Sequence, residues 1–178
     1  MPIYTKKGDK GETGLFKKVD GHSVRVSKSS CNTRAIGAVD EIDSFVGIVI
    51  SLSHDEVLKV KLKRIQNNLL TIGSILAGSN LKILPSETKR LEKEIDECDK
   101  FLPTLTNFIF PGGSPVASHL QYARTLARRA EREVVAFNEE QKLPANVLKY
   151  INRLSDYLFT LARVENFKLG VKDEIWKK

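Results

Sequence analysis

Apolar residues recur at spacings of three and four in five stretches of the chain, the pattern of helices that bury one face. The least interrupted stripe comprises Leu58, Leu62, Ile65, Leu69, Ile72 and Leu76. The stripes predict helices from Thr33 to about Ser53, from Leu58 to Leu76, from Pro85 to just before Pro103, from Pro115 past Val134, and from near Pro144 to near Gly170. No useful stretch alternates with a period of two, and the connections are short. We therefore predict an all-α, up-and-down five-helix bundle.

Residues 1–33 show no helical period and are predicted to form an irregular segment ahead of a bundle at 34–170, both within one domain over 1–178. The small, hydroxyl and cationic residues at its start are Thr5, Lys6, Lys7, Gly8, Gly11, Thr13 and Gly14. Glycines three apart can turn backbone N–H groups toward one point, as in a phosphate cradle, with Arg25, Ser27 and Lys28 as further contacts. No P-loop motif is present, and taken alone the segment is more simply a flexible arm.

The fourth stretch combines an apolar stripe with a row of arginines. Ser114 can cap the helix and Pro115 can occupy its first position, where a missing N–H costs nothing. Arg124, Arg128 and Arg132 then fall four residues apart, and each like-charged pair costs roughly 0.2 to 0.5 kcal/mol in an isolated helix. Two interpretations stand equal. Either the neighbouring glutamates and solvent suffice, or the row binds an anion such as a phosphate chain.

The fifth stretch carries Asn152 and Asp156 on one helical face. If that face meets the arginine helix, Asp156 can pair with one of its arginines while Asn152 offers an amide to a ligand. Polar residues at the rim of a bundle also often pair only with each other. In the first stretch, Asp43 interrupts the apolar stripe.

The composition of the chain limits the kinds of ligand and partner that it can be expected to bind. The net charge of +7 and pI of about 9.4 indicate an anionic partner, either a nucleotide, another phosphate compound or nucleic acid. Cys31, Cys98 and three scattered histidines match neither a disulfide framework nor a zinc motif, so we expect no metal held by protein side chains. No apolar run approaches the roughly 20 residues of a membrane span and no signal-peptide core opens the chain, so we expect a cytoplasmic protein without a membrane partner.

Four segments together resemble the PduO-type family of ATP:cob(I)alamin adenosyltransferases. They are IYTKKGDKGETGL, RVSK followed by AIGAVDEIDS, FIFPGGSPVASHLQYARTLARRAERE, and YINRLSDYLFTLAR. Their order and spacing span most of the chain, although residues 45–107, 134–149 and the tail carry no motif. Each segment is a weak signal, whereas four in register are specific.

The resemblance implies roles position by position. The family's N-terminal motif binds the ATP polyphosphate, which here would assign Thr5, Lys6, Lys7, Gly8, Thr13 and Gly14, with Lys28 adding charge. Its nucleotide-binding helix and its N-R-L-S-D motif would add Arg128, Arg129, Glu131, Arg132 and Asn152. Asp40 and Arg124 match an ion pair between subunits, and Phe108 matches an aromatic residue that shields the lower face of the corrin. Asp40, Phe108, Arg124 and Arg128 are thus the expected catalytic residues.

The implied reaction is adenosyl transfer, in which Co(I) attacks the 5′-carbon of ATP and triphosphate leaves. Cobalamin, as cob(I)alamin or cob(II)alamin, is then a substrate, and Mg²⁺ is held mainly through the ATP phosphates. The resemblance also implies a homotrimer of five-helix bundles with active sites between subunits. A reductase and an enzyme that accepts adenosylcobalamin can be further partners.

The sequence departs from the family pattern at two positions, and two alternatives to an enzyme stay open. Lys7 stands where many relatives have a smaller polar residue, and Trp176 is only a candidate for the family's C-terminal aromatic residue. A protein that carries or senses adenosylcobalamin would need much the same pocket. A basic helical nucleic-acid-binding module would explain the charge, but no such motif is present and a single tyrosine, Tyr122, interrupts the arginine helix. Without the resemblance, Phe108 would be taken for an ordinary core aromatic residue.

Overall fold

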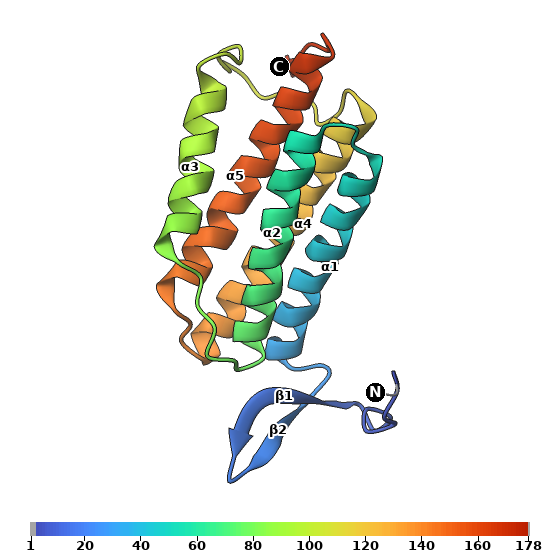
Figure 1. The fold of residues 1–178 in the computed structure, drawn as a ribbon, viewed down its shortest axis with the longest axis vertical. Helices are drawn as coiled ribbons and strands as arrows, with labels where there is room; N and C mark the ends of the chain where they lie inside the picture. Colours follow the sequence, from blue (N-terminus) through green and yellow to red (C-terminus); the bar gives the residue numbers. More distant parts are fainter. Residues whose placement is uncertain (1–2, 178) are drawn as a thin grey trace.

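The computed structural model describes residues 3–177 as five α-helices preceded by a β-hairpin (Figure 1). The elements are β1 (Glu12–Val19), β2 (His22–Ser27), α1 (Cys31–Leu52), α2 (Glu56–Leu76), α3 (Pro85–Asp99), α4 (Pro115–Glu140) and α5 (Ala145–Lys168). The predicted five-helix bundle is confirmed, with helix ends within a few residues of the prediction. The side chains of Ser30, Asp55 and Ser114 accept backbone N–H groups at the starts of α1, α2 and α4.

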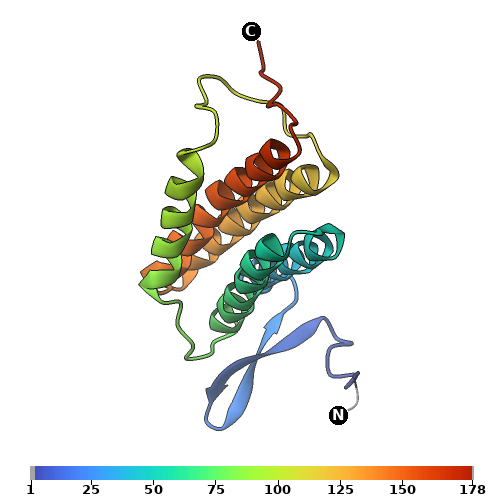
Figure 2. The ribbon, with the colours of Figure 1, turned by 45° about the horizontal axis from the view of Figure 1, so that its top comes forward.

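Successive helices run in opposite directions along the bundle axis (Figures 1 and 2). The closest pairs of helices are α4 with α5, α1 with α4, and α1 with α2, each antiparallel, while α3 lies outermost and packs mainly on α5. Within the described part of the chain, no helix combines the length and apolarity that crossing a membrane would need.

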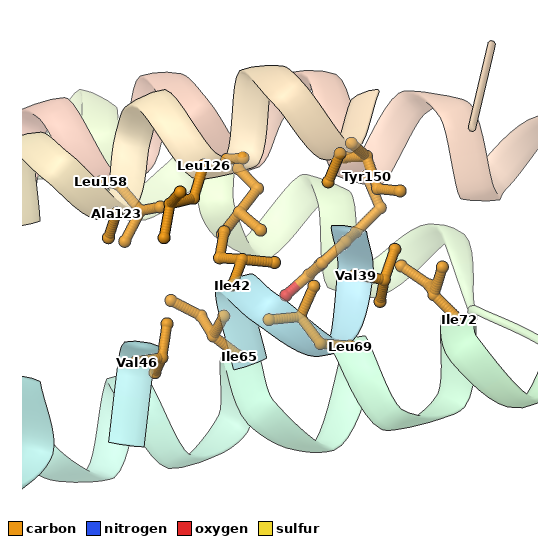
Figure 3. Close-up of a cluster of buried hydrophobic side chains, with 14 of the residues drawn as sticks. Val39, Ile42, Val46, Ile65, Leu69, Ile72, Ala123, Leu126, Tyr150 and Leu158 are labelled. Carbon is orange, nitrogen blue, oxygen red and sulfur yellow. The ribbon is translucent and has the colours of Figure 1, made fainter. Parts of the chain in front are cut away.

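The predicted apolar stripes form the core between the helices. All six residues of the α2 stripe are buried, and so are Leu154 and Leu158 of α5. Figure 3 shows side chains of α1, α2, α4 and α5 meeting there, among them Ile42, Leu69 and Leu126. Burial of these faces therefore sets which polar side chains lie on the outer surfaces of α4 and α5.

The N-terminal segment forms a β-hairpin, so the prediction of an irregular segment was wrong for residues 12–27. Glu12 pairs with Ser27 and Val19 with His22 in antiparallel register. Asp20 and Gly21 form the turn, both with positive φ, 49° and 79°, as a type I′ hairpin turn requires. An Asp-Gly pair between two short strands is itself a recognised hairpin signal, and it was available in the sequence.

The hairpin is attached to the C-terminal end of α2. The backbone N–H groups of Phe16 and Lys17 point to the carbonyl of Ala77, at 2.8 and 3.4 Å. Gly78 has φ of +90°, and a Cβ there would lie 2.8 Å from the Cβ of Lys17. This close approach fixes the hairpin beyond the end of the bundle at which α1 begins (Figure 1).

At the other end of the bundle, Asn166 of α5 holds the Pro-Gly-Gly turn that precedes α4. Its side-chain Oδ1 accepts from the Ser114 N–H at 2.9 Å, and its Nδ2 donates to the Gly112 carbonyl at 2.9 Å. Gly113 lies between them with φ of +106°, and a Cβ there would be 2.3 Å from Asn166 Oδ1. The sequence marked the glycines as a break, but it did not reveal this buried amide as their partner.

A polar network ties the outlying α3 to α2 and α5. Glu94 accepts a hydrogen bond from the Tyr157 hydroxyl and forms salt bridges with Lys61 at 3.1 Å and Arg64 at 2.6 Å. Burial by itself would raise the pKa of the Glu94 carboxyl, but the hydrogen bonds from Tyr157 and Lys61 and the nearby cations outweigh it and lower that pKa. Burial and the Glu94 carboxylate raise the pKa of Tyr157, so its hydroxyl stays a donor.

We predict that Glu94→Gln lowers the free energy of unfolding at neutral pH by about 1–3 kcal/mol, because two cations and a hydroxyl lose their carboxylate. Because the pKa of Glu94 is lower in the folded protein than in the unfolded chain, its carboxylate stabilises the fold fully at pH values above the unfolded-state pKa. This stabilisation is lost as the pH falls through the folded-state pKa. Urea unfolding of both proteins should therefore show a difference that shrinks toward pH 3. Glu97→Gln, at an exposed position on α3, serves as control; an equal difference at both pH values would contradict the assignment.

We also predict that Gly113→Ala costs at least about 2 kcal/mol, because the new Cβ combines an unfavourable φ with a clash against Asn166. In a chain of this size that lowers Tm by about 4 °C or more. Gly112→Ala is the matched control, since a Cβ at Gly112 meets no heavy atom within 4 Å and its φ is not positive. Equal melting temperatures for the two variants would show that the clamp does not constrain the turn.

Candidate functional site

A cavity of about 720 Å³ lies between the 5–14 loop and the hairpin. Its lining includes six of the seven predicted polyphosphate residues of the N-terminal region, namely Thr5, Lys7, Gly8, Thr13, Gly14 and Lys28. Lys6 does not line this cavity and instead has a positive φ of 59°. The lining is completed by Glu12, His22, Ser23 and Arg25.

Arg25 of β2 and Lys28, which follows β2, hold the 5–14 loop against the hairpin. Arg25 donates from Nη2 to the Lys7 carbonyl at 2.6 Å and from Nε to Glu12 at 3.1 Å, while Lys28 Nζ donates to the Gly8 carbonyl at 3.0 Å. The loop is thus folded against the hairpin instead of extending as a free arm. Positive charge and backbone groups converge on one hollow, which suits a polyanion. Arg25, which the sequence marked only as a further contact, organises this loop.

The arginine row lies on the outer surface of α4 without acidic partners. Among residues 3–177, no acidic side chain forms a salt bridge with Arg124, Arg128 or Arg132, and Arg132 donates only to the Arg128 carbonyl, at 3.1 Å. The glutamates that could have neutralised the row are engaged elsewhere. Glu131 accepts from Asn152 Nδ2 at 2.7 Å, and Glu133 pairs with Arg34 at 3.4 Å. The structure therefore favours an external anion over internal neutralisation.

Two predicted neighbours of the row have other partners. Arg129 forms a salt bridge with Glu41 of α1, so its guanidinium is directed toward that helix. Asp156 pairs with Arg153 of its own helix at 2.7 Å, so the hypothesis that it pairs with an arginine of α4 was wrong. Asp156 nevertheless lines a cavity of about 470 Å³ together with Arg124 and Arg128. Asp99 and Arg163 line this cavity as well, so its lining carries charges of both signs.

Arg124 stands at the junction of two cavities. It lines the 470 Å³ cavity and a second one of about 990 Å³. Burial, reinforced by the charge of Arg128, lowers its pKa, while its Nε donates to Gln121 at 3.0 Å. A partly desolvated cation without a carboxylate partner has a strong tendency to bind one from outside the chain.

The predicted partner Asp40 forms no salt bridge with Arg124 within the described residues and lies exposed on α1. Asp43, one turn away, differs in its surroundings. Burial raises the pKa of Asp43, repulsion from Asp40 raises it further, and attraction to Lys63 partly offsets both. Among the described residues, its Oδ1 atom is buried without a hydrogen-bond partner. Asp40 is therefore the carboxylate of this pair that a second molecule can reach.

The 990 Å³ cavity has an aromatic wall. Phe108 is 80% exposed, which excludes the core-residue interpretation, and its ring meets Trp176 edge to face with centroids 6.4 Å apart. The tail and the 108–110 segment pair as short antiparallel strands. Trp176 N–H donates to the Phe108 carbonyl and Phe110 N–H to the Glu174 carbonyl, both at 2.8 Å. A flat apolar surface therefore borders a cavity that Arg124 also lines.

The cradle and the aromatic wall lie at opposite ends of one chain. Figures 1 and 2 show the hairpin beyond the end where α1 begins, and the 100–114 loop and C-terminal tail at the other end. The 22 residues of α1 alone rise about 33 Å. An extended triphosphate is much shorter than this, so a triphosphate held in the cradle would not reach the aromatic wall of the same chain.

Comparison with known proteins identifies the family. The profile of the family described as cobalamin adenosyltransferase matches residues 3–165. The chain is 42% identical to a corrinoid adenosyltransferase of Bacillus subtilis, an alignment covering 97% of this chain and 91% of that protein. It is 37% identical to the human corrinoid adenosyltransferase, with 99% and 73% covered.

Solved structures give the same answer. A variant PduO-type ATP:corrinoid adenosyltransferase from Lactobacillus reuteri, complexed with cobalamin and ATP, is similar to this chain with a TM-score of 0.93 at 37% identity, covering 99% of this chain and 100% of that one. A second variant, complexed with ATP, has a TM-score of 0.91 at 38% identity, covering 98% and 100%. The family match, the near full-length identities and the shared fold place this chain in the PduO-type family of corrinoid adenosyltransferases.

Proposed function

We propose that this chain is an enzyme that transfers the 5′-deoxyadenosyl group of ATP to cob(I)alamin, giving adenosylcobalamin and triphosphate. Family membership and the cobalamin and ATP bound in the similar Lactobacillus reuteri protein support this function. The observation that carries it is the 990 Å³ cavity, in which an exposed aromatic wall adjoins the first residue of an arginine row without acidic partners. That combination suits a flat macrocycle beside a polyphosphate.

The reaction needs no nucleophile from the protein. The electron pair of Co(I) attacks the 5′-carbon, the Co–C bond forms, and the C–O bond breaks with its electrons on the leaving triphosphate. The protein must position two substrates and stabilise the negative charge of the leaving group. The cradle residues Thr5, Lys7, Gly8 and Lys28 supply donors and positive charge for that task. Arg128, which lines the 470 Å³ cavity, and Arg132, one turn further along α4, add to that charge. Glu131 fixes the orientation of the Asn152 amide beside them.

The aromatic wall serves the other substrate. Cob(II)alamin is hard to reduce while a lower axial ligand is bound, and an apolar surface under the corrin favours the ligand-free form. Phe108 supplies that surface and Trp176 extends it. The roles of Lys6 and Arg129 toward ATP stay predictions, since the first lies outside the cradle lining and the second is paired with Glu41.

Magnesium is proposed to be held by ATP. No group of three or more His, Cys, Asp or Glu side chains among the described residues could hold a metal ion. Mg²⁺ retains water readily and prefers phosphate oxygens to an all-protein cage. When bound to the triphosphate it would neutralise part of the charge that the lysines and arginines do not reach.

The separation of the two regions supports active sites between subunits. The cradle of one chain would meet the arginine row and aromatic wall of another, and Asp40 would pair with the partly buried Arg124 across the same boundary. We propose a homotrimer, the assembly that the family resemblance implies, acting in the cytoplasm. A reductase that supplies the electron and an enzyme that uses adenosylcobalamin are the further partners that fit this chemistry.

An anaerobic assay with chemically reduced cobalamin, ATP and Mg²⁺ tests the proposal. We expect loss of the cob(I)alamin spectrum, a light-sensitive adenosylcobalamin product and one triphosphate per product. Binding of both substrates without turnover would favour a carrier or regulator of adenosylcobalamin. Binding of neither, with strongly salt-dependent binding of DNA or RNA, would favour the nucleic-acid-binding module.

Arg128→Ala is predicted to lower kcat/KM for ATP by about tenfold or more, since a charge-assisted contact to phosphate is lost. Helicity and Tm should be unchanged, because the side chain is exposed and its guanidinium forms no salt bridge within residues 3–177. Arg90→Ala on α3 removes an equally exposed cation far from the row and should leave kinetics unchanged. Equal kinetics for the two variants would remove Arg128 from the nucleotide site.

Mixed oligomers test the division of the site. Phe108→Ala and Lys28→Ala chains are each expected to be impaired alone. If cradle and wall come from different subunits, each trimer that contains both variants has one site in three that pairs the two unaltered regions. The mixed trimers should then recover up to about a third of wild-type activity. Purification through a different tag on each variant isolates the mixed oligomers. No recovery in such oligomers would mean that one chain supplies both regions.

A further inference from the structure

The C-terminal part of α5 carries a buried cation to which the proposed reaction assigns no role. Arg163 is 5% exposed, the least exposed of the charged residues in the buried set. Its Nε and Nη2 lie 3.0 and 2.9 Å from Asp173 Oδ2, and Nη2 also donates to the Pro103 carbonyl at 2.6 Å. Asp173 belongs to the tail, and Pro103 begins the loop that leads to Phe108. One guanidinium therefore joins three separate segments.

These contacts lie next to the aromatic wall. Asp173 precedes Trp176 by three residues, and the two intervening residues, Glu174 and Ile175, pair with the 109–110 segment. This pairing involves few backbone hydrogen bonds, and an isolated two-stranded pairing of that length is marginal in water. A buried, charged hydrogen bond provides a stronger and more directional anchor.

We propose that Arg163 and Asp173 form a latch that positions Trp176 against Phe108 and so assembles the corrin-facing wall. The inference rests on the proposed function. Arg163 fixes the start of the 103–110 loop through Pro103 and the start of the tail through Asp173, and thereby sets the spacing of the two rings. Neither Arg163 nor Asp173 lines the 990 Å³ cavity that the two rings border. Arg163 also borders the 470 Å³ cavity, but its guanidinium is engaged by Asp173 and the Pro103 carbonyl. In this proposal both residues act on the corrin side through Trp176, as positioning residues.

The alternative is that the ion pair only stabilises the end of α5. The two roles differ in what they affect. A purely structural pair would change stability and lower every activity together. A latch would alter the position of Trp176 and the step that depends on the wall, the use of cob(II)alamin, while sparing the use of prereduced cob(I)alamin and the KM for ATP.

The sequence offers a direct probe, because Trp176 is the only tryptophan in the 178 residues. We expect Asp173→Asn to raise acrylamide quenching of its fluorescence by about twofold, since the residue is 41% exposed in the latched tail and would become nearly fully exposed. Glu174→Gln is the matched control. It removes a neighbouring exposed tail charge but leaves the backbone carbonyl that Phe110 contacts, and it should quench like wild type.

The activity test compares two assays on the same variants. In the assay that starts from cob(II)alamin and a reductant, Asp173→Asn should form adenosylcobalamin about tenfold more slowly than wild type. In the assay that starts from cob(I)alamin, the rate should fall by less than about twofold, and the KM for ATP should be unchanged. In a Trp176→Ala background, Asp173→Asn should add less than about a twofold loss, because both changes disable the same element. Asp173→Glu should restore part of the cob(II)alamin activity.

Three outcomes would each overturn the latch. Asp173→Asn could be quenched no more than wild type, or it could lose equal activity in the two assays. Its loss could also multiply with that of Trp176→Ala in the double variant. Far-UV circular dichroism and urea unfolding identify a variant that has simply lost stability. Arg163→Lys then provides a second test from the other partner, with the same expected pattern. If wild-type protein forms no adenosylcobalamin from cob(I)alamin, the proposed function fails, and the quenching comparison still decides whether the latch exists.

Discussion

The arrangement of three arginines on α4 is the electrostatic constraint on which the site depends. Four-residue spacing forces their guanidinium groups into one line, and the bundle buries the first of them enough to lower its pKa. The glutamates nearby are paired with Asn152 and Arg34 and do not neutralise the row. A folded chain thus retains a repulsive surface, which a polyphosphate would relieve. The same surface explains why a basic chain need not be a nucleic-acid-binding protein.

The second constraint is distance. A five-helix bundle places its N-terminal hairpin and its 100–114 loop at opposite ends (Figure 1), about one helix length apart. Substrates that react with each other must touch, so regions this far apart act together only when they come from different chains. Oligomerisation in this proposal is a geometric requirement of the site. A partly desolvated arginine and an exposed aspartate then offer a natural contact across the boundary.

In the proposed function, the chemistry divides along the same lines, with the cradle serving the triphosphate and the aromatic wall serving the corrin. Charge neutralisation requires many donors held in approximate positions, which a loop of glycine, threonine and lysine anchored by Arg25 and Lys28 provides. Control of the corrin's lower face requires a flat apolar surface at a defined place, which needs firmer support. The Asn166 clamp and the Arg163 contacts, both at the last turns of α5, provide it for the two segments that carry the rings.

The sequence by itself determined the helices, their buried faces and the arginine row, because three-four periodicity and caps are local properties that burial then enforces. Its motifs also identified the family, and with it the reaction. The hairpin was missed although Asp20-Gly21 signalled it, since β1 does not alternate and β2 alternates over only a few residues. Only the tertiary structure decided which charged and polar groups pair. Glu131 with Asn152, Arg129 with Glu41, Arg163 with Asp173 and Asn166 with Gly112 and Ser114 join residues from different elements. Such contacts follow from how helices and loops pack, which no local pattern encodes.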